Sequence, residues 1–195
     1  MIEIIAEIGS VHDGSLGNAK KLIEVAKFCG ANTVKFQMHI SEEETLKEAL
    51  TPNYFTDEKR FEYFNRIAFN EKQWEQLIKH CKKTKINFLC SPFSIKAVKI
   101  LEKLKVNCYK IPSGEINNIP LLKKVAATNK KCILSTGMSN WSEIDHAIKI
   151  FNKNKLVLMQ CSSIYPCPPD KSGINVVSEM KNKYSLKLGF SDHTK

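Results

Sequence analysis

Two lysines lie inside otherwise apolar stretches of the sequence, where a charged side chain is unusual. Lys35 occurs in TVKFQ and Lys110 in CYKIPS. An ammonium group in such surroundings is costly unless an anion or a carboxylate compensates it. Two explanations are open: a structural ion pair with Glu7 or Glu115, or an anionic ligand held by the lysines. The two lysines are therefore the first candidates for chemistry.

Serines close several apolar stretches of the same kind. Ser91, Ser113 and Ser135 would give hydroxyl donors suited to phosphate or carboxylate oxygens. One serine after a strand is more often a helix cap than a ligand. The coincidence of several serines with two lysines favours an anion site.

Histidines supply the remaining candidates. His193, in GFSDHT, follows an apolar stretch and could bind a divalent metal or act as an acid or base. His12 and His39 follow the first and second stretches and are further candidates, whereas His80 and His146 lie in helical patterns and are expected to face solvent. The sequence contains no H-x-x-H or H-E-x-x-H pair.

Short apolar runs alternate with helical patterns along the whole chain. The runs are IEIIAEIG, TVKFQ, INFLCS, CYKIPS, CILSTG, LVLMQCS and LKLGFS. Helical stripes recur at i, i+3, i+4 and i+7, as in Trp74, Leu77, Ile78 and Cys81 and again in Ile144, Ala147, Ile148 and Phe151. This alternation indicates a parallel sheet covered by helices.

The number of strand-helix units distinguishes the possible architectures. Seven units without a G-x-G-x-x-G turn favour a barrel over the dinucleotide-binding fold. A complete barrel typically needs ~250 residues, and this chain has 195. The sequence therefore predicts one α/β domain over residues 1–195, an incomplete (β/α)8 TIM barrel with about seven of eight units.

In a parallel barrel the functional side chains gather where strands end. Strand alternation places Lys35 and Gln37 on one face and Val34 and Phe36 on the other. The polar residues that close the predicted strands are Glu7, Lys35, Gln37, Ser91, Lys110, Ser113, Ser135, Ser162, Ser163, Ser191 and His193.

The connection from Met38 to Asn70 is the longest between predicted strands and helices. Loops of this length are often lids or binding segments. Its aromatic residues predict an ordered helical cap over the barrel mouth rather than a specific ligand contact. They are Tyr54, Phe55, Phe61, Tyr63 and Phe64.

Charge and cysteine content argue against several classes of protein. The net charge is +10, but the lysines alternate with acids in stretches such as KEALTPNYFTDEKRFEYF and KILEKLK, which favours a solvated surface over nucleic-acid binding. Seven scattered cysteines without a CxxC pair predict buried free thiols. The first segment lacks a basic region and is too short for a signal peptide or membrane span, so a cytoplasmic protein without a membrane partner is expected.

Seven motifs at these strand ends closely resemble, in order, the catalytic barrel of the N-acetylneuraminate (sialic acid) synthase family. They are AEIGSVHDG, GANTVKFQ, FLCSPFS, YKIPSGE, LSTGM, CSSIYPCPP and GFSDHT. The resemblance covers the whole chain, and the SVHDGS variant is similar to the branch often labelled spore coat polysaccharide synthases.

The resemblance implies an enzyme of surface polysaccharide biosynthesis. It would condense phosphoenolpyruvate with an N-acyl hexosamine, such as N-acetylmannosamine, to a nine-carbon ulosonic acid and phosphate. A divalent metal, Mn or Mg, polarises the sugar aldehyde in this family. Carbon 3 of phosphoenolpyruvate then attacks the aldehyde, and water adds at C2 before phosphate leaves by C–O cleavage.

The resemblance also assigns roles to individual residues. Glu7 would contact the reacting centre and handle protons, and His193 matches one of two histidine metal ligands. Gln37, Glu115 and Tyr165 match positions around the sugar. The phosphoenolpyruvate site would comprise Lys35, Lys110, Ser91, Ser113, Ser135 and Ser191, with Ser163 where the family often has Asn.

The chain departs from the family pattern at Val11 and Ser163, each of which replaces a common Asn. We expect the eighth strand, the second histidine ligand and a C-terminal antifreeze-like domain to lie beyond residue 195, with a homodimer formed by the full-length protein. Three alternatives stay open: a phosphoenolpyruvate aldolase of the 3-deoxy-sugar phosphate type, a non-catalytic truncated barrel that binds an anionic metabolite or a partner chain, and a nucleic-acid binder. YKIPSGE and the YPxP motif favour the sialic branch.

Overall fold

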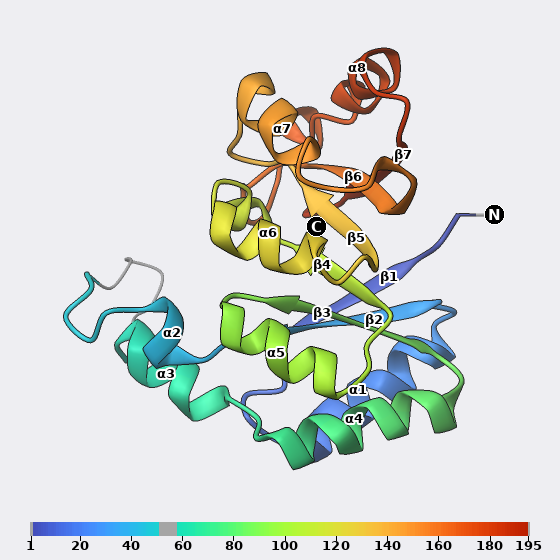
Figure 1. The fold of residues 1–195 in the computed structure, drawn as a ribbon. Helices are drawn as coiled ribbons and strands as arrows, with labels where there is room; N and C mark the ends of the chain where they lie inside the picture. The colour runs from blue at the N-terminus through green and yellow to red at the C-terminus, as the bar shows by residue number, and fades with distance from the viewer. Residues whose placement is uncertain (1, 51–57, 195) are drawn as a thin grey trace. The chain divides into compact units, whose positions relative to one another are not determined.

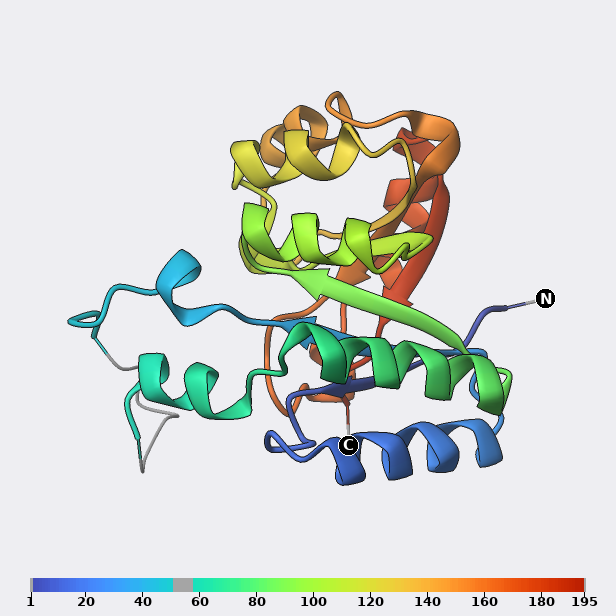
Figure 2. The same cartoon turned by 60° about the horizontal axis from the view of Figure 1, so that its bottom comes forward.

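The computed structural model describes residues 2–50 and 58–194. Its contacts group the chain into two compact units, Met1–Val106 and Asn107–Lys195. Both units are built from parallel strands and helices in alternation, which Figures 1 and 2 show from two directions.

The first unit contains three parallel strands that pair in chain order. The strands are β1 (Ile5–Gly9), β2 (Thr33–Met38) and β3 (Asn87–Pro92). The helices are α1 (Leu16–Phe28), α2 (Ser41–Glu44), α3 (Arg60–Ile67), α4 (Glu71–Thr84) and α5 (Ile95–Lys103). Helices α1, α4 and α5 lie along one face of the three strands (Figures 1 and 2).

Strand β2 shows why the sequence folds this way. Val34, Phe36 and Met38 are buried toward one face, whereas Lys35 and Gln37 are only partly buried. This alternation is the one expected of a strand with an apolar face under helices and a polar face on the other side. The predicted separation of Lys35 and Gln37 from Val34 and Phe36 is therefore confirmed.

The second unit contains four parallel strands, which also pair in chain order. The strands are β4 (Cys108–Ile111), β5 (Lys131–Ser135), β6 (Leu156–Cys161) and β7 (Lys187–Ser191). The helices are α6 (Ile119–Ala126), α7 (Trp141–Ile148) and α8 (Asn175–Lys183), and the short 3-10 turns are η1 (Ser113–Glu115), η2 (Lys153–Lys155) and η3 (Pro169–Lys171). Tyr109, Ile111 and Leu134 are fully buried and anchor this core.

All seven predicted strands are present, and several predicted boundaries shift. The first strand begins at Ile5 rather than Ile2, and the fourth ends at Ile111, before Pro112. The predicted apolar face of α7 included Phe151, but the helix ends at Ile148, so Phe151 is not part of that face.

The described part of the connection after β2 contains two helices, α2 and α3. Residues 45–50 and 58–59 of this connection are not helical. Phe61 and Phe64 are buried on α3, as expected of apolar mass in an ordered segment. Tyr54 and Phe55 lie outside the described residues.

The cysteines and histidines of the helices also test the sequence analysis. All the cysteines are free thiols and most are buried, as predicted, although Cys29 is exposed. His146 faces solvent as expected. His80 does not: its side chain is 18% exposed and lies 3.2 Å from Glu24. None of the described helices is long and apolar enough to cross a membrane.

The turn after β1 depends on a glycine. Gly14 has φ +76°, and a Cβ added to it would lie 2.7 Å from the backbone oxygen of Arg66. The Arg66 side chain reaches back and donates to Asp13 at 2.6 Å. The turn that ends β1 is thus packed closely against α3.

We predict opposite effects for two glycine substitutions. Gly14→Ala should lower the free energy of unfolding by more than about 1 kcal/mol, because the new methyl group meets backbone at a left-handed residue. Gly17→Ala, in α1 and clear of such contact, should raise it by up to about 1 kcal/mol. Urea denaturation of both variants measures the difference, and shifts of the same sign would contradict this account of the turn.

Candidate functional site

Strands β1, β2 and β3 bring together Glu7, Lys35, Gln37 and Ser91, which we call the first cluster. Lys35 forms an ion pair with Glu7, its neighbour across the β1–β2 register. The lysine side chain is 12% exposed and the glutamate side chain 49%. Of the two explanations for Lys35, the ion pair with Glu7 is therefore present, and its carboxylate remains open to solvent.

A β-bulge shapes this cluster at Gly9. The β1–β2 register shifts between Glu7 and Gly9, and Gly9 has φ +50°. A Cβ at Gly9 would lie 3.1 Å from Glu7 Oε1 and 3.6 Å from Gln37 Nε2. The bulge therefore lets both polar groups lie close to the backbone of β1, as bulges beside active sites often do.

Ser91 has a buried hydroxyl without a hydrogen-bond partner in the described part of the chain. It lies opposite Gln37 in the β2–β3 register. An unsatisfied buried hydroxyl costs about 1–3 kcal/mol. Because native structures rarely tolerate this cost without a reason, Ser91 marks a position for a ligand or a water.

The neighbouring thiol and imidazole of the first unit are not poised for acid-base work. Burial raises the pKa of the Cys90 thiol, and the nearby Lys35 only partly opposes this. Burial also lowers the pKa of His12 to about 4. His12 stacks on Phe69, with ring centroids 4.5 Å apart, and its Nδ1 accepts from Gly14 N at 3.1 Å. His12 is therefore a neutral structural residue of the turn.

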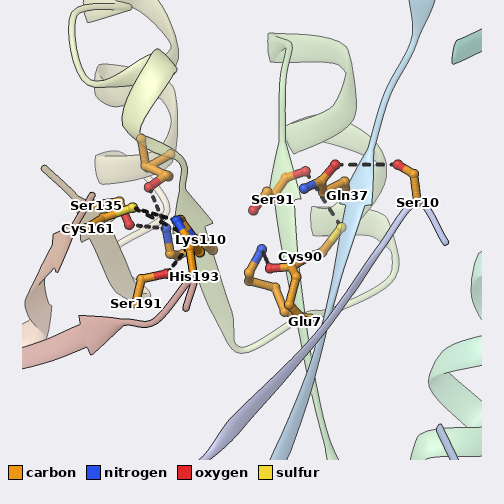
Figure 3. Close-up of polar contacts among 12 residues, drawn as sticks. Glu7, Ser10, Gln37, Cys90, Ser91, Lys110, Ser135, Cys161, Ser191 and His193 are labelled. Atoms are coloured by element: carbon orange, nitrogen blue, oxygen red, sulfur yellow. Dashed lines mark hydrogen bonds and ion pairs between the residues drawn. The ribbon is translucent and has the colours of Figure 1, made fainter. Parts of the chain in front are cut away.

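The second unit gathers polar groups at the carboxyl ends of its own strands. This second cluster comprises Lys110, Ser113, Ser135, Ser163, Tyr165, Ser191 and His193. Lys110 is buried, and its Nζ donates to Ser135 Oγ at 2.6 Å and to the Ile111 carbonyl at 3.1 Å. Figure 3 shows Lys110, Ser135, Ser191 and His193 converging from β4, β5 and β7.

Gly137, just after β5, is surrounded by oxygens. A Cβ there would lie 2.7 Å from Ser163 Oγ, 2.8 Å from Ser113 Oγ and 2.8 Å from the Cys161 carbonyl. Ser113 Oγ is buried and makes no hydrogen bond with the described residues. Hydroxyls that crowd around a bare glycine form a polar, donor-rich surface of the kind that oxyanions bind.

His193 has the geometry of a metal ligand. Its Nδ1 lies 2.7 Å from the Ser162 carbonyl, which can only accept, so Nδ1 carries the proton. The lone pair of Nε2 then faces Tyr165 Oη and Ser191 Oγ, each 3.3 Å away. Metal-binding histidines are typically oriented through such a backbone carbonyl. The residue fits a divalent metal, although no group of three His, Cys, Asp or Glu among the described residues could hold one.

Other predicted site residues have local roles in the second unit. Glu115 lies on η1 and accepts from Asn118 Nδ2 at 2.7 Å. Ser162 Oγ lies within hydrogen-bonding distance of the Lys171 and Ser172 carbonyls, so it fixes the loop after β6. Tyr165 stacks on the His193 ring, with centroids 4.2 Å apart.

Sequence reasoning missed residues that carry no charge. Ser10 donates to Gln37 Oε1 at 3.4 Å, and Cys161 Sγ lies 3.9 Å from His193 Nδ1. Gly9 and Gly137 matter because a side chain at either position would crowd the clusters. The glycine of LSTGM, just after a predicted strand, was the available signal for Gly137.

Comparison with known proteins relates the whole chain to one group of synthases. The chain is 39% identical to N,N'-diacetyllegionaminic acid synthase of Campylobacter jejuni, over 98% of this chain and 60% of that protein. It also resembles the crystal structure of N-acetylneuraminic acid (sialic acid) synthetase from Leptospira borgpetersenii in complex with citrate. That match has a TM-score of 0.86 and 33% identity over 100% of this chain and 66% of the other.

A third match supports the predicted branch. The spore coat polysaccharide biosynthesis protein SpsE of Bacillus subtilis aligns with a TM-score of 0.84 and 30% identity, over 99% of this chain and 53% of that one. The predicted resemblance is thus confirmed, and the chain spans little more than half the length of these relatives. The predicted fold class, an α/β TIM barrel that is incomplete, is also confirmed, with seven strands among the described residues.

The sequence matches the NeuB family over residues 22–195. This span includes nearly every residue of the two clusters, with Glu7 before it. The chain is a member of the NeuB family.

Proposed function

We propose that this protein condenses phosphoenolpyruvate with an N-acyl hexosamine to give a nine-carbon ulosonic acid and phosphate. The observation that carries the proposal is the pair of largely buried lysines, Lys35 in β2 and Lys110 in β4, each beside oxygen-bearing side chains. Cations fixed in advance where charge develops are what a reaction between an anionic enol phosphate and an aldehyde requires.

The second cluster suits the anionic groups of phosphoenolpyruvate. Lys110 supplies a positive charge, and Ser135 and Ser113 supply hydroxyls, one of them without a partner among the described residues. Hydrogen bonds from charged donors to phosphate or carboxylate oxygens are about twice as strong as neutral ones. We assign Ser163 and Ser191 to the same phosphate or carboxylate contacts.

The first cluster suits proton handling near the reacting carbon. In the proposed reaction C3 of phosphoenolpyruvate forms a bond to the aldehyde carbon, water adds at C2, and phosphate leaves with cleavage of its C–O bond. We assign the half-exposed Glu7 carboxylate, which forms an ion pair with Lys35, to accept a proton from that water. Gln37, Glu115 and Tyr165 are assigned to the sugar.

A divalent metal, Mn or Mg, would supply polarisation of the aldehyde when bound. Among the described residues His193 would hold it through Nε2, because its Nδ1 is committed to the Ser162 carbonyl. Ser191 and Tyr165 lie beside the same nitrogen and orient the ring.

Loss of the first-cluster ammonium should abolish turnover. Lys35→Ala is expected to lower kcat/KM at least 100-fold, as expected when a transition-state charge partner is removed. Phosphate release from phosphoenolpyruvate, with manganese and a panel of N-acyl hexosamines, measures this in the 195-residue chain and in a version extended through the reading frame downstream of Lys195. Lys21→Ala, at a surface pair with Glu24, is the control.

Sugar-dependent release that needs Lys35 supports the synthase. If the wild-type proteins release no phosphate with any sugar in the panel, the synthase proposal fails. Release only with a sugar phosphate that carries no N-acyl group would favour the related aldolase, and binding of phosphoenolpyruvate without turnover would favour the non-catalytic anion binder.

A methyl group at Gly137 should block the second cluster. Gly137→Ala is expected to weaken phosphoenolpyruvate binding at least tenfold, because the methyl group meets two hydroxyls and a backbone carbonyl at less than 3 Å. Gly114→Ala is the matched control, since a Cβ there has open space. Calorimetric titration with phosphoenolpyruvate measures both affinities, and equal losses in the two variants would argue against an anion site at Gly137.

Removal of His193 should reduce metal affinity. His193→Ala is expected to weaken Mn binding at least tenfold and to lower activity in parallel, because one nitrogen ligand is lost. Electron paramagnetic resonance of free Mn reports binding without any turnover. His146→Ala, on the exposed side of α7, should bind Mn as the wild type does. Unchanged Mn affinity in His193→Ala would exclude this residue as a ligand.

A further inference from the structure

His39 is a buried residue that the proposed reaction does not use. It follows β2 directly, and its odd position places it on the same strand face as Lys35 and Gln37. Its ring lies between two phenylalanines: Phe64 at 3.8 Å and 9° between planes, and Phe93 at 4.1 Å and 24°. The imidazole is therefore held flat in one orientation.

Both nitrogens of this ring face oxygens. Nδ1 lies 3.1 and 3.0 Å from the two carboxylate oxygens of Glu44, and Nε2 lies 3.1 Å from Gln37 Oε1. A carboxylate and an amide oxygen accept hydrogen bonds and do not donate them. The geometry thus calls for a proton on each nitrogen, with the resulting charge balanced by Glu44.

Glu44 is fixed as firmly as the ring. Its side chain is 5% exposed, and that of His39 is 4% exposed. Glu44 Oε1 also accepts from the backbone N–H of Ile40 at 2.9 Å. A buried ion pair often adds little to stability compared with well-packed apolar residues, so a pair of this kind is better explained by the geometry it imposes.

The His39–Glu44 pair determines the orientation of the Gln37 amide. His39 and Ser10 both direct donors at Gln37 Oε1, from 3.1 and 3.4 Å. The amide nitrogen is left on the other side, toward Ser91 in Figure 3. Nε2 makes no hydrogen bond within the described part of the chain, so its two N–H groups are available to a ligand.

We propose that His39, paired with Glu44, is a positioning residue that locks the Gln37 amide with its NH2 group toward the substrate. The substrate group that meets Gln37 is then a hydrogen-bond acceptor, a carbonyl or hydroxyl oxygen of the amino sugar. This inference rests on the proposed function for the identity of the substrate. The protonation of His39 and the orientation of Gln37 do not depend on it.

The first test measures the protonation of the two His39 ring nitrogens by NMR. In 15N-histidine-labelled protein at pH 7, the His39 signals should show both nitrogens protonated, and the signals are assigned by their loss in His39→Phe. Glu44→Gln, which keeps the shape but removes the balancing charge, should convert the ring to the neutral form. One unprotonated nitrogen in the wild type would overturn the proposal.

The second test measures the effect of the Gln37 amide orientation on the steady-state kinetics of the protein. The double variant His39→Phe/Glu44→Met keeps an aromatic ring between the phenylalanines and removes both charges together, so that neither is left unpaired. It should raise KM for the amino sugar at least tenfold and change KM for phosphoenolpyruvate less than twofold. In a Gln37→Met background the same pair should have no further effect on the sugar KM, because the amide it orients is gone.

Phe61→Leu serves as the control for a loss of packing alone. Phe61 is buried on α3 and its carbonyl accepts from Ser41, so its truncation loosens the same segment. It should lower the melting temperature without raising the sugar KM selectively. Equal increases in both KM values, or a full additional effect in the Gln37→Met background, would show that His39 is only structural. If wild-type protein turns over no sugar, the proposed function fails, and the nitrogen signals alone decide the positioning claim.

Discussion

The cost of placing an ammonium group among apolar strands governs the arrangement of both clusters. Lys35 meets this cost with the Glu7 carboxylate across the β1–β2 register, and Lys110 meets part of it with the Ser135 hydroxyl and a backbone carbonyl. Both side-chain contacts require adjacent parallel strands in a particular register, because Glu7 lies on β1 beside β2 and Ser135 lies on β5 beside β4. The packing of helices against the other face keeps these strands in place.

Much of the fold was predictable because a buried parallel strand leaves a plain pattern in the sequence. Short apolar runs identified all seven strands, and the lysines inside two of them marked the polar face correctly. Strand ends were less certain. The start of β1 at Ile5 depends on where its pairing with β2 begins.

The charged and histidine residues of the candidate site could be proposed from the sequence. Glu7, Lys35, Lys110 and His193 were found from their residue types and places. The orientation of Gln37 was not, because it depends on a histidine and a glutamate that meet only in the folded chain. Glycines such as Gly137 were missed because their contribution is the space they leave beside backbone.

The ion pair between Lys35 and Glu7 makes the carboxylate an internal competitor for any anion that approaches this lysine. A weakly held anion such as chloride gains little by displacing a carboxylate that is already in contact. The pair therefore keeps the Lys35 charge compensated by a neighbouring strand, and any anion that binds this lysine has to compete with a carboxylate that is already in contact.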